Sequence, residues 1–149
     1  MSHLMKISEA ASLALHAMSL LARYPDRRFS NVEMAKLFKA SEHSLAKVTQ
    51  RLVRANLIDS MRGPSGGFVI ARQARDISIL EIYEAVDGPI GKPGCLLGKG
   101  SCEHVSCILG GLACQVTSLV RERFQTTTLL ELSDSMKLGD GLNAQKKHS

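Results

Sequence analysis

The chain has 149 residues, of which 44% are hydrophobic and 22% charged, as is typical of a soluble globular protein. Its apolar stretch at residues 10–22 is interrupted by His16 and is shorter than a membrane span, so we expect a cytoplasmic protein without an export signal. The charge is uneven. Residues 1–75 carry twelve Lys and Arg against five Asp and Glu, whereas residues 76–149 carry seven against nine. The first half therefore favours a polyanionic partner.

Three helices are predicted in the first third of the chain. The first begins after Ser8 as N-cap and runs to about Arg23, where Tyr24 and Pro25 end it. The capping box formed by Ser30 and Glu33 opens a short second helix that ends near residue 39. The third spans about residues 43–55, and Asn56 tolerates the left-handed conformation that stops it. Two short helices joined by a brief turn indicate a helix-turn-helix.

A hairpin and a fourth helix are predicted next. Residues 57–61 and 68–71 have the pattern of two strands, and the glycine-rich residues 63–67 form the turn between them. A helix that includes residues 77–86 then ends at Asp87 and Gly88. A hairpin directly after a helix-turn-helix is a wing, so residues 1–90 are expected to form a winged helix-turn-helix domain.

This arrangement predicts DNA binding, with the third helix in the major groove. Any single Lys or Arg could be part of an ordinary solvated face; the combination of cap, turn, basic helix and glycine-rich wing is what is specific. Arg27, Arg28, Arg72 and Arg75 could extend the basic surface. The expected DNA-binding residues are His43, Ser44, Lys47, Gln50, Arg51, Arg54, Arg62, Gly66 and Gly67.

All four cysteines lie within twenty residues, at Cys95, Cys102, Cys107 and Cys114. Clustered thiolates beside a glycine-rich loop suggest a metal or iron–sulfur site. Zinc is a rival, although structural zinc sites usually have shorter paired spacings. We assign residues 91–106 to a cysteine-containing loop. Residues 107–138 are assigned to a long dimerisation helix with a short C-terminal helix, and residues 139–149 to a disordered tail.

At this point the chain resembles the bacterial winged-helix regulators that include IscR, NsrR and CymR. The matching stretches are MKISEAASLALHAM, LAKVTQRLVRANLIDSMRGPSGGF and ISILEIYEAVDGPI. The resemblance implies a mainly α-helical homodimer in which the N-terminal helix contributes to the interface. It also implies a transcription regulator, most often a repressor, that binds a palindromic operator in double-stranded DNA. No RNA or membrane partner and no enzymatic activity are expected.

The resemblance also implies that Cys95, Cys102 and Cys107 hold a [2Fe-2S] or [4Fe-4S] cluster. Related proteins complete the cluster with a histidine where this chain has Gly110, or with an acidic residue where it has Ser12. Neither ligand is present. The remaining candidates for a fourth ligand, in order of preference, are His16, Cys114 and His104.

The sequence therefore predicts a DNA-binding regulator whose operator affinity depends on a cluster that senses redox state, nitric oxide or iron–sulfur status. A cluster-free regulator with a thiol or ligand switch is the alternative. A small iron–sulfur electron carrier is a further possibility, but a carrier would not need a basic wing.

Overall fold

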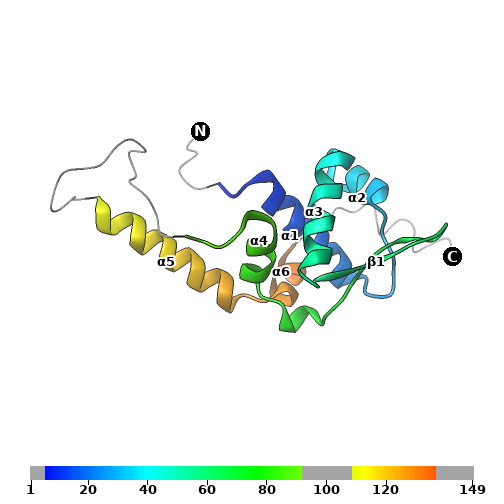
Figure 1. Ribbon diagram of the computed structural model, residues 1–149. Helices are drawn as coiled ribbons and strands as arrows, with labels where there is room; N and C mark the ends of the chain where they lie inside the picture. The colour runs from blue at the N-terminus through cyan, green and yellow to red at the C-terminus, as the bar shows by residue number, and fades with distance from the viewer. Residues whose placement is uncertain (1–5, 92–108, 137–149) are drawn as a thin grey trace.

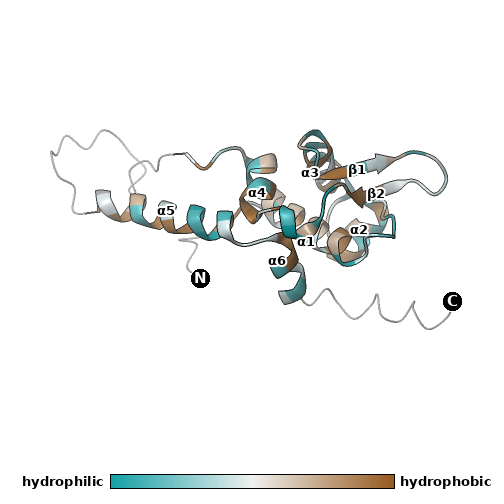
Figure 2. Cartoon of the chain, turned by 90° about the horizontal axis from the view of Figure 1, so that it is seen from below, coloured by the Kyte–Doolittle hydropathy of each residue, from teal (hydrophilic) through white to brown (hydrophobic). Residues whose placement is uncertain are grey.

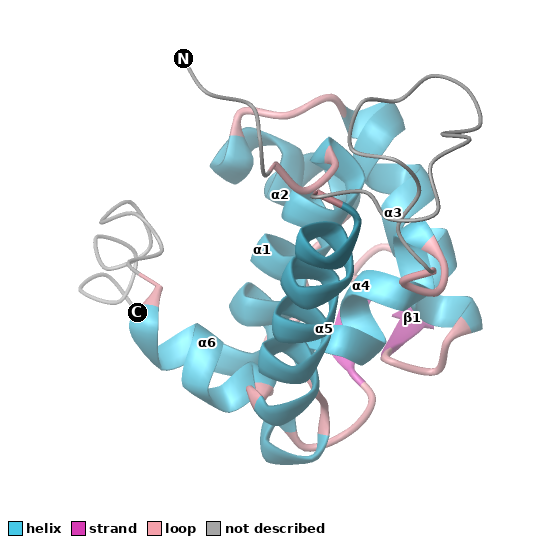
Figure 3. Ribbon diagram, turned by 90° about the vertical axis from the view of Figure 1, so that its left-hand side faces the viewer, coloured by secondary structure: helices cyan, strands magenta, loops and turns pink. Residues whose placement is uncertain are grey.

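The computed structural model describes residues 6–91 and 109–136. Six α-helices and one antiparallel hairpin occur in these ranges, so the expectation of a mainly α-helical winged-helix fold is confirmed. Figure 3 shows that, apart from the hairpin, the described chain is almost entirely helix and loop. The bounds are α1 (Glu9–Arg23), α2 (Asn31–Phe38), α3 (Glu42–Arg54), β1 (Ile58–Met61), β2 (Gly67–Ile70), the 3-10 turn η1 (Ala74–Asp76), α4 (Ile79–Asp87), α5 (Gly110–Thr126) and α6 (Leu129–Ser135).

Side-chain caps define where most of these helices begin. The Ser8 side chain accepts a hydrogen bond from the N–H of Ala11 at the start of α1, as predicted. Ser30 and Glu33 form the predicted capping box of α2. Asn56 has φ +57°, which confirms the left-handed stop after α3. The sequence rules of helix capping therefore located the helix-turn-helix to within one or two residues.

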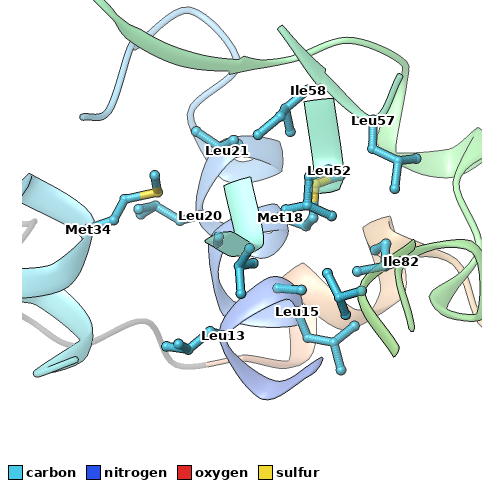
Figure 4. Close-up of a cluster of buried hydrophobic side chains, with 14 of the residues drawn as sticks. Leu13, Leu15, Met18, Leu20, Leu21, Met34, Leu52, Leu57, Ile58 and Ile82 are labelled. Carbon is cyan, nitrogen blue, oxygen red and sulfur yellow. The ribbon is translucent and has the colours of Figure 1, made fainter. Parts of the chain in front are cut away.

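The hydrophobic core lies between α1, α3, α4 and the start of the hairpin. Figure 4 shows Leu15 and Met18 of α1 directed toward the side chains of Leu52, Leu57 and Ile82. All five are at most 9% exposed. Nine of the 15 residues of α1 are buried, and the helix packs against α3, α4 and α6. This burial positions α3 on the outside of the domain.

The wing is larger than the hairpin alone. In the β1–β2 ladder, Ile58 pairs with Ile70 and Met61 pairs with Gly67. Phe29, which precedes α2, joins this ladder through an isolated β-bridge, because its N–H and carbonyl both bond Phe68 at 3.2 and 2.9 Å. The Phe29 side chain is fully buried. The base of the wing is therefore anchored in the core.

Helix α5 projects from this domain on the side away from the wing (Figure 1). One side of α5 packs on α4, where Tyr83 and Phe124 form a tilted aromatic pair with centroids 5.6 Å apart. Leu112 and Leu119 are 48% and 65% exposed, so part of the apolar surface of α5 is not covered by α4. In Figure 2, hydrophobic and hydrophilic patches alternate along α5.

Helix α6 returns the chain to the domain. Ser78 and Thr128, the N-caps of α4 and α6, face each other in an isolated β-bridge. Two main-chain bonds, of 3.0 and 2.8 Å, join Ile79 to Thr127 and Leu129 to Ile77. Leu129 is fully buried, so α6 belongs to the core of the winged-helix domain. None of the helices in the described ranges is long and apolar enough to cross a membrane.

Candidate nucleic-acid interface

The outer face of α3 carries an uninterrupted polar stripe. Leu45, Val48, Thr49 and Leu52 are buried on the inner face. Residues spaced by four, three and four positions lie along one side of a helix. The stripe opposite the core therefore consists of His43, Lys47, Gln50 and Arg54, all exposed. Three of these four side chains, those of His43, Lys47 and Arg54, are basic. The structure places all four residues on one face of α3.

Ser44 and Arg51, two other residues expected to contact DNA, lie on a flank of α3 that faces α1. With Lys47 and Val48 they line a narrow groove, whose other wall is formed by Glu9, Ala10 and Leu13. Arg51 reaches past this groove and donates a 2.6 Å hydrogen bond from Nη1 to the carbonyl oxygen of Val86. Arg51 is an exposed residue whose guanidinium nevertheless makes a contact within the domain, which its position on a basic helix did not suggest.

The wing turn begins at the exposed Arg62 and ends at Gly66 and Gly67. Gly66 and Gly67 were predicted to be DNA-binding residues, and in the structure they have an internal role as well. A Cβ on Gly66 would lie 2.6 Å from the Met61 carbonyl oxygen. Gly67 has φ +153°, and its Cβ would lie 2.8 Å from the carbonyl oxygen of Phe29. Both glycines are needed for the turn to close and to dock.

Several arginines of the basic surface are engaged within the protein. The guanidinium of Arg27 lies 4.6 Å from the Phe29 ring centroid and 3.7 Å from the Glu33 carboxylate. Arg28 donates to the Ser65 carbonyl in the wing turn, at 3.4 Å. Arg72 bonds Glu81 at 2.8 Å and the carbonyl of Asp76 at 2.9 Å. These contacts brace the wing and the start of α4.

The last turn of α4 is where three other helices attach. The Ser8 hydroxyl, which caps α1, donates to the Asp87 carboxylate at 2.6–2.7 Å. Arg121 of α5 donates to Glu84 at 3.2 Å. Arg51 of α3 bonds Val86, as described above. Burial raises the pKa of the Tyr83 hydroxyl, and the neighbouring Asp87 carboxylate raises it further.

Most of the expected cluster ligands lie outside the described residues, namely Cys95, Cys102, Cys107 and His104. Within the described ranges, no group of three His, Cys, Asp or Glu side chains is placed to hold a metal ion. The cysteine loop assigned to residues 91–106, apart from Gly91, and the tail assigned to 139–149 also fall outside the described residues. The sulfur of Cys114 is a free thiol on an exposed position of α5.

His16 is half-buried on α1, where its ring lies 5.8 Å from that of Phe38 between centroids. Its Nδ1 lies 2.7 Å from the Ser12 carbonyl oxygen. Since a carbonyl oxygen only accepts, Nδ1 carries the hydrogen, and Nε2 of the neutral ring keeps a lone pair. Histidines that bind metals commonly have their second ring nitrogen held in this way.

Comparison with known proteins places this geometry in a family. IscR of Klebsiella pneumoniae is 30% identical over 105 residues, which cover 70% of this chain and 64% of that protein. A candidate helix-turn-helix transcriptional regulator of Aquifex aeolicus is 29% identical over 147 residues, or 97% of this chain and 96% of its own. The structure of CymR, the global cysteine regulator of B. subtilis, matches with a TM-score of 0.74 and 27% identity, covering 89% of this chain and 99% of CymR.

The model of the Rrf2 family, described as iron-dependent transcriptional regulators, matches residues 7–135. That range includes every helix and strand described above. The resemblance seen in the sequence is therefore confirmed, and the chain belongs to the Rrf2 family of transcriptional regulators, a family of DNA-binding proteins and not of enzymes.

Proposed function

We propose that this regulator binds a palindromic operator as a homodimer, with α3 of each subunit in the major groove and the wing beside it, and that it acts as a repressor. The observation that carries the proposal is the stripe of His43, Lys47, Gln50 and Arg54 on the face of α3 opposite the core. Side chains of these types hydrogen-bond base edges and phosphates. Arg62 stands at the start of the wing turn, where it extends the same basic surface.

The homodimer is supported by α5. Leu112 and Leu119 are among the most exposed large hydrophobic side chains in the described ranges, and they lie on a helix that projects from its own domain. A second copy of α5 would cover both in a two-fold arrangement. Such symmetry would present two recognition helices to two half-sites related by the same axis, which is why a palindrome is the expected operator.

We further propose that Cys95, Cys102 and Cys107 hold an iron–sulfur cluster of the [2Fe-2S] or [4Fe-4S] type that controls operator affinity. The donor set fits, because thiolates are the usual ligands of such clusters. When bound, such a cluster supplies one-electron redox chemistry and an iron that reacts with nitric oxide or oxygen. Gly91, the last described residue before the cysteines, follows α4 by only a few positions.

The fourth ligand is proposed to be His16 of the partner subunit's first helix or, failing that, Cys114 or His104. The Ser12 carbonyl supports His16, since it orients the ring and leaves Nε2 as a donor atom. The packing of the same ring on Phe38 is also compatible with a purely structural histidine. Cys114 is exposed and has its thiol available, which keeps it in consideration.

One experiment tests both proposals. The protein is purified without oxygen, its visible spectrum and iron content are recorded, and a preferred duplex is selected from a random-sequence pool. Binding to that duplex is then measured before and after nitric oxide or air. A coloured protein whose affinity changes supports the cluster switch. A colourless protein that binds equally in every state would leave a regulator without one, and a protein indifferent to duplex DNA would refute the operator proposal.

Variants assign the ligands. Cys102→Ala should lose the colour and change repression in cells, whereas Ser101→Ala, next to it, should do neither. His16→Ala and Cys114→Ala are compared for iron content, and the larger loss identifies the fourth ligand. Unchanged repression by Cys102→Ala would refute the proposal that the cluster controls operator affinity.

A second candidate is a cluster-free regulator with a thiol or small-ligand switch. The similarity to CymR, a cysteine regulator, favours keeping it. A hollow of about 410 Å³ between α4 and α5, lined by Ile7, Tyr83, Ile90, Val116 and Phe124 among others, could admit a small apolar molecule. Under this alternative, the anaerobic protein is colourless and DNA binding responds to oxidant or ligand alone. An electron carrier is disfavoured, because the family comprises DNA-binding regulators.

A further inference from the structure

Arg51 is the one basic side chain of α3 that bonds another helix of the domain in the described ranges. Its Nη1 lies 2.6 Å from the carbonyl oxygen of Val86, which is 35 residues further along the chain. Lys47, Arg51 and Arg54 are all exposed and form no ion pair with any described residue, so the bond to Val86 is what sets Arg51 apart. The contact therefore distinguishes Arg51 from its neighbours on the same helix.

The partner of Arg51 is an acceptor that the helix itself leaves open. The last carbonyls of an α-helix have no intrahelical donor. In α4, the N–H of Gly88 donates to the carbonyl oxygen of Glu84, which is the last backbone hydrogen bond of the helix. The carbonyl oxygen of Val86, two residues further on, therefore has no donor within the helix. A guanidinium suits this place because it donates in a defined geometry and because its positive charge complements the C-terminal end of the helix dipole.

The same turn of α4 also holds α1 and α5. Ser8 at the start of α1 bonds Asp87, and Arg121 of α5 bonds Glu84. Arg51 is thus the polar link that adds α3 to this junction. Without it, the side of α3 that faces α1 would be held by packing alone along the groove lined by Ser44 and Val48.

We propose that Arg51 is a positioning residue, which holds α3 against the last turn of α4 and so sets the angle of the recognition helix, instead of neutralising a DNA phosphate. The inference rests on the proposed operator binding. It replaces the expectation from the sequence that Arg51 contacts DNA directly. A positioning role changes which sequence is preferred, whereas a phosphate contact strengthens binding to all sequences alike.

The dependence of DNA binding on salt separates the two roles. Each phosphate contact that is lost lowers the slope of log K against log salt by about 0.9 for duplex DNA. We compare Arg51→Met with Arg54→Met, the same substitution three residues along on the exposed stripe. Binding to the selected duplex and to a random duplex is measured over a series of KCl concentrations.

Arg54→Met should reduce the slope by about one contact and weaken both duplexes equally. Arg51→Met should leave the slope unchanged and lower the preference for the selected duplex by about tenfold, the size of one mismatched base pair. Ser78→Ala, which weakens the opposite end of α4, controls for lost stability and should change neither quantity. Should Arg51→Met fail to fold, Arg51→Lys replaces it. Lysine keeps the charge for a phosphate but lacks the reach of the guanidinium, so a positioning role still predicts lost preference at an unchanged slope.

The inference is overturned if the salt slope falls in Arg51→Met as it does in Arg54→Met. It is also overturned if a variant at position 51 keeps both the wild-type slope and the wild-type preference for the selected duplex. Either result would leave the proposed function intact, since the wild-type protein would still prefer its duplex. If the wild-type protein binds no duplex at all, the proposed function and the positioning role fail together.

Discussion

Gly67→Ala adds one carbon atom at the place where the wing packs against the backbone of Phe29, and so tests how firmly the wing is docked. The new Cβ would lie 2.8 Å from the carbonyl oxygen of Phe29 and 2.9 Å from its carbonyl carbon, both backbone atoms that cannot rotate away. The φ of +153° adds conformational strain of about 1–3 kcal/mol. Overpacking against a fixed neighbour costs a similar amount, about 1–3 kcal/mol. We therefore expect a loss of about 3 kcal/mol in the free energy that holds the wing on the domain.

Two other glycines serve as matched controls in urea unfolding. Gly63 also has a positive φ, +111°, but nothing lies within 4 Å of its Cβ position, so Gly63→Ala should cost only the strain. Gly91→Ala, without contacts or a positive φ, should be neutral. Because the wing could detach without unfolding the core, amide exchange at Phe68, whose N–H bonds Phe29, is measured as well. The reasoning is refuted if Gly67→Ala is no more destabilising than Gly63→Ala in both measurements.

Three further predictions concern stability. Ser19→Ala should stabilise the protein by about 1 kcal/mol, because the fully buried Ser19 hydroxyl has no hydrogen-bond partner among the described residues; lower urea resistance would contradict this. Ser78→Ala removes the capping box of α4 and should cost about 1 kcal/mol in thermal unfolding, while an unchanged midpoint would show that the cap is dispensable. Partial burial opposes the charge of Glu81, but its bonds with Arg72 and Ser78 outweigh this and lower the pKa of Glu81. The stabilisation from this pair is complete at pH values above the ordinary pKa of a glutamate and is lost as the pH falls through the lowered pKa of Glu81. The difference in free energy of unfolding between wild type and Arg72→Met should therefore disappear in acid. A difference that does not depend on pH would exclude this pair as its source.

The local signals in the sequence were sufficient for the helix-turn-helix. Ser8 and Ser30 cap the helices assigned to them, and Asn56 adopts the left-handed conformation expected of it. Each of these features depends on residues within four positions of one another. Capping and turn chemistry can therefore be read from a short window of sequence.

The contacts that span long separations were not predictable in the same way. Nothing near Arg51 indicates that a carbonyl 35 residues later lies within its reach. The β-bridge of Phe29 and the covered side of α5 likewise depend on how distant segments pack. For the candidate site, the sequence named the residues on the outer stripe of α3 as DNA-binding residues together with Ser44 and Arg51, and it could not indicate that Ser44 and Arg51 line the groove facing α1.

The pairing of Ser78 with Thr128 has a consequence for how the protein is made. Leu129 and α6 complete the core around α1, although 105 residues separate the end of α1 from the start of α6 in the chain. During synthesis, the winged-helix domain therefore cannot close until α6 has left the ribosome. An earlier product, ending before α5, would leave apolar surface of α1 exposed to solvent. Nascent chains of this protein should accordingly become resistant to protease only when α6 has left the ribosome.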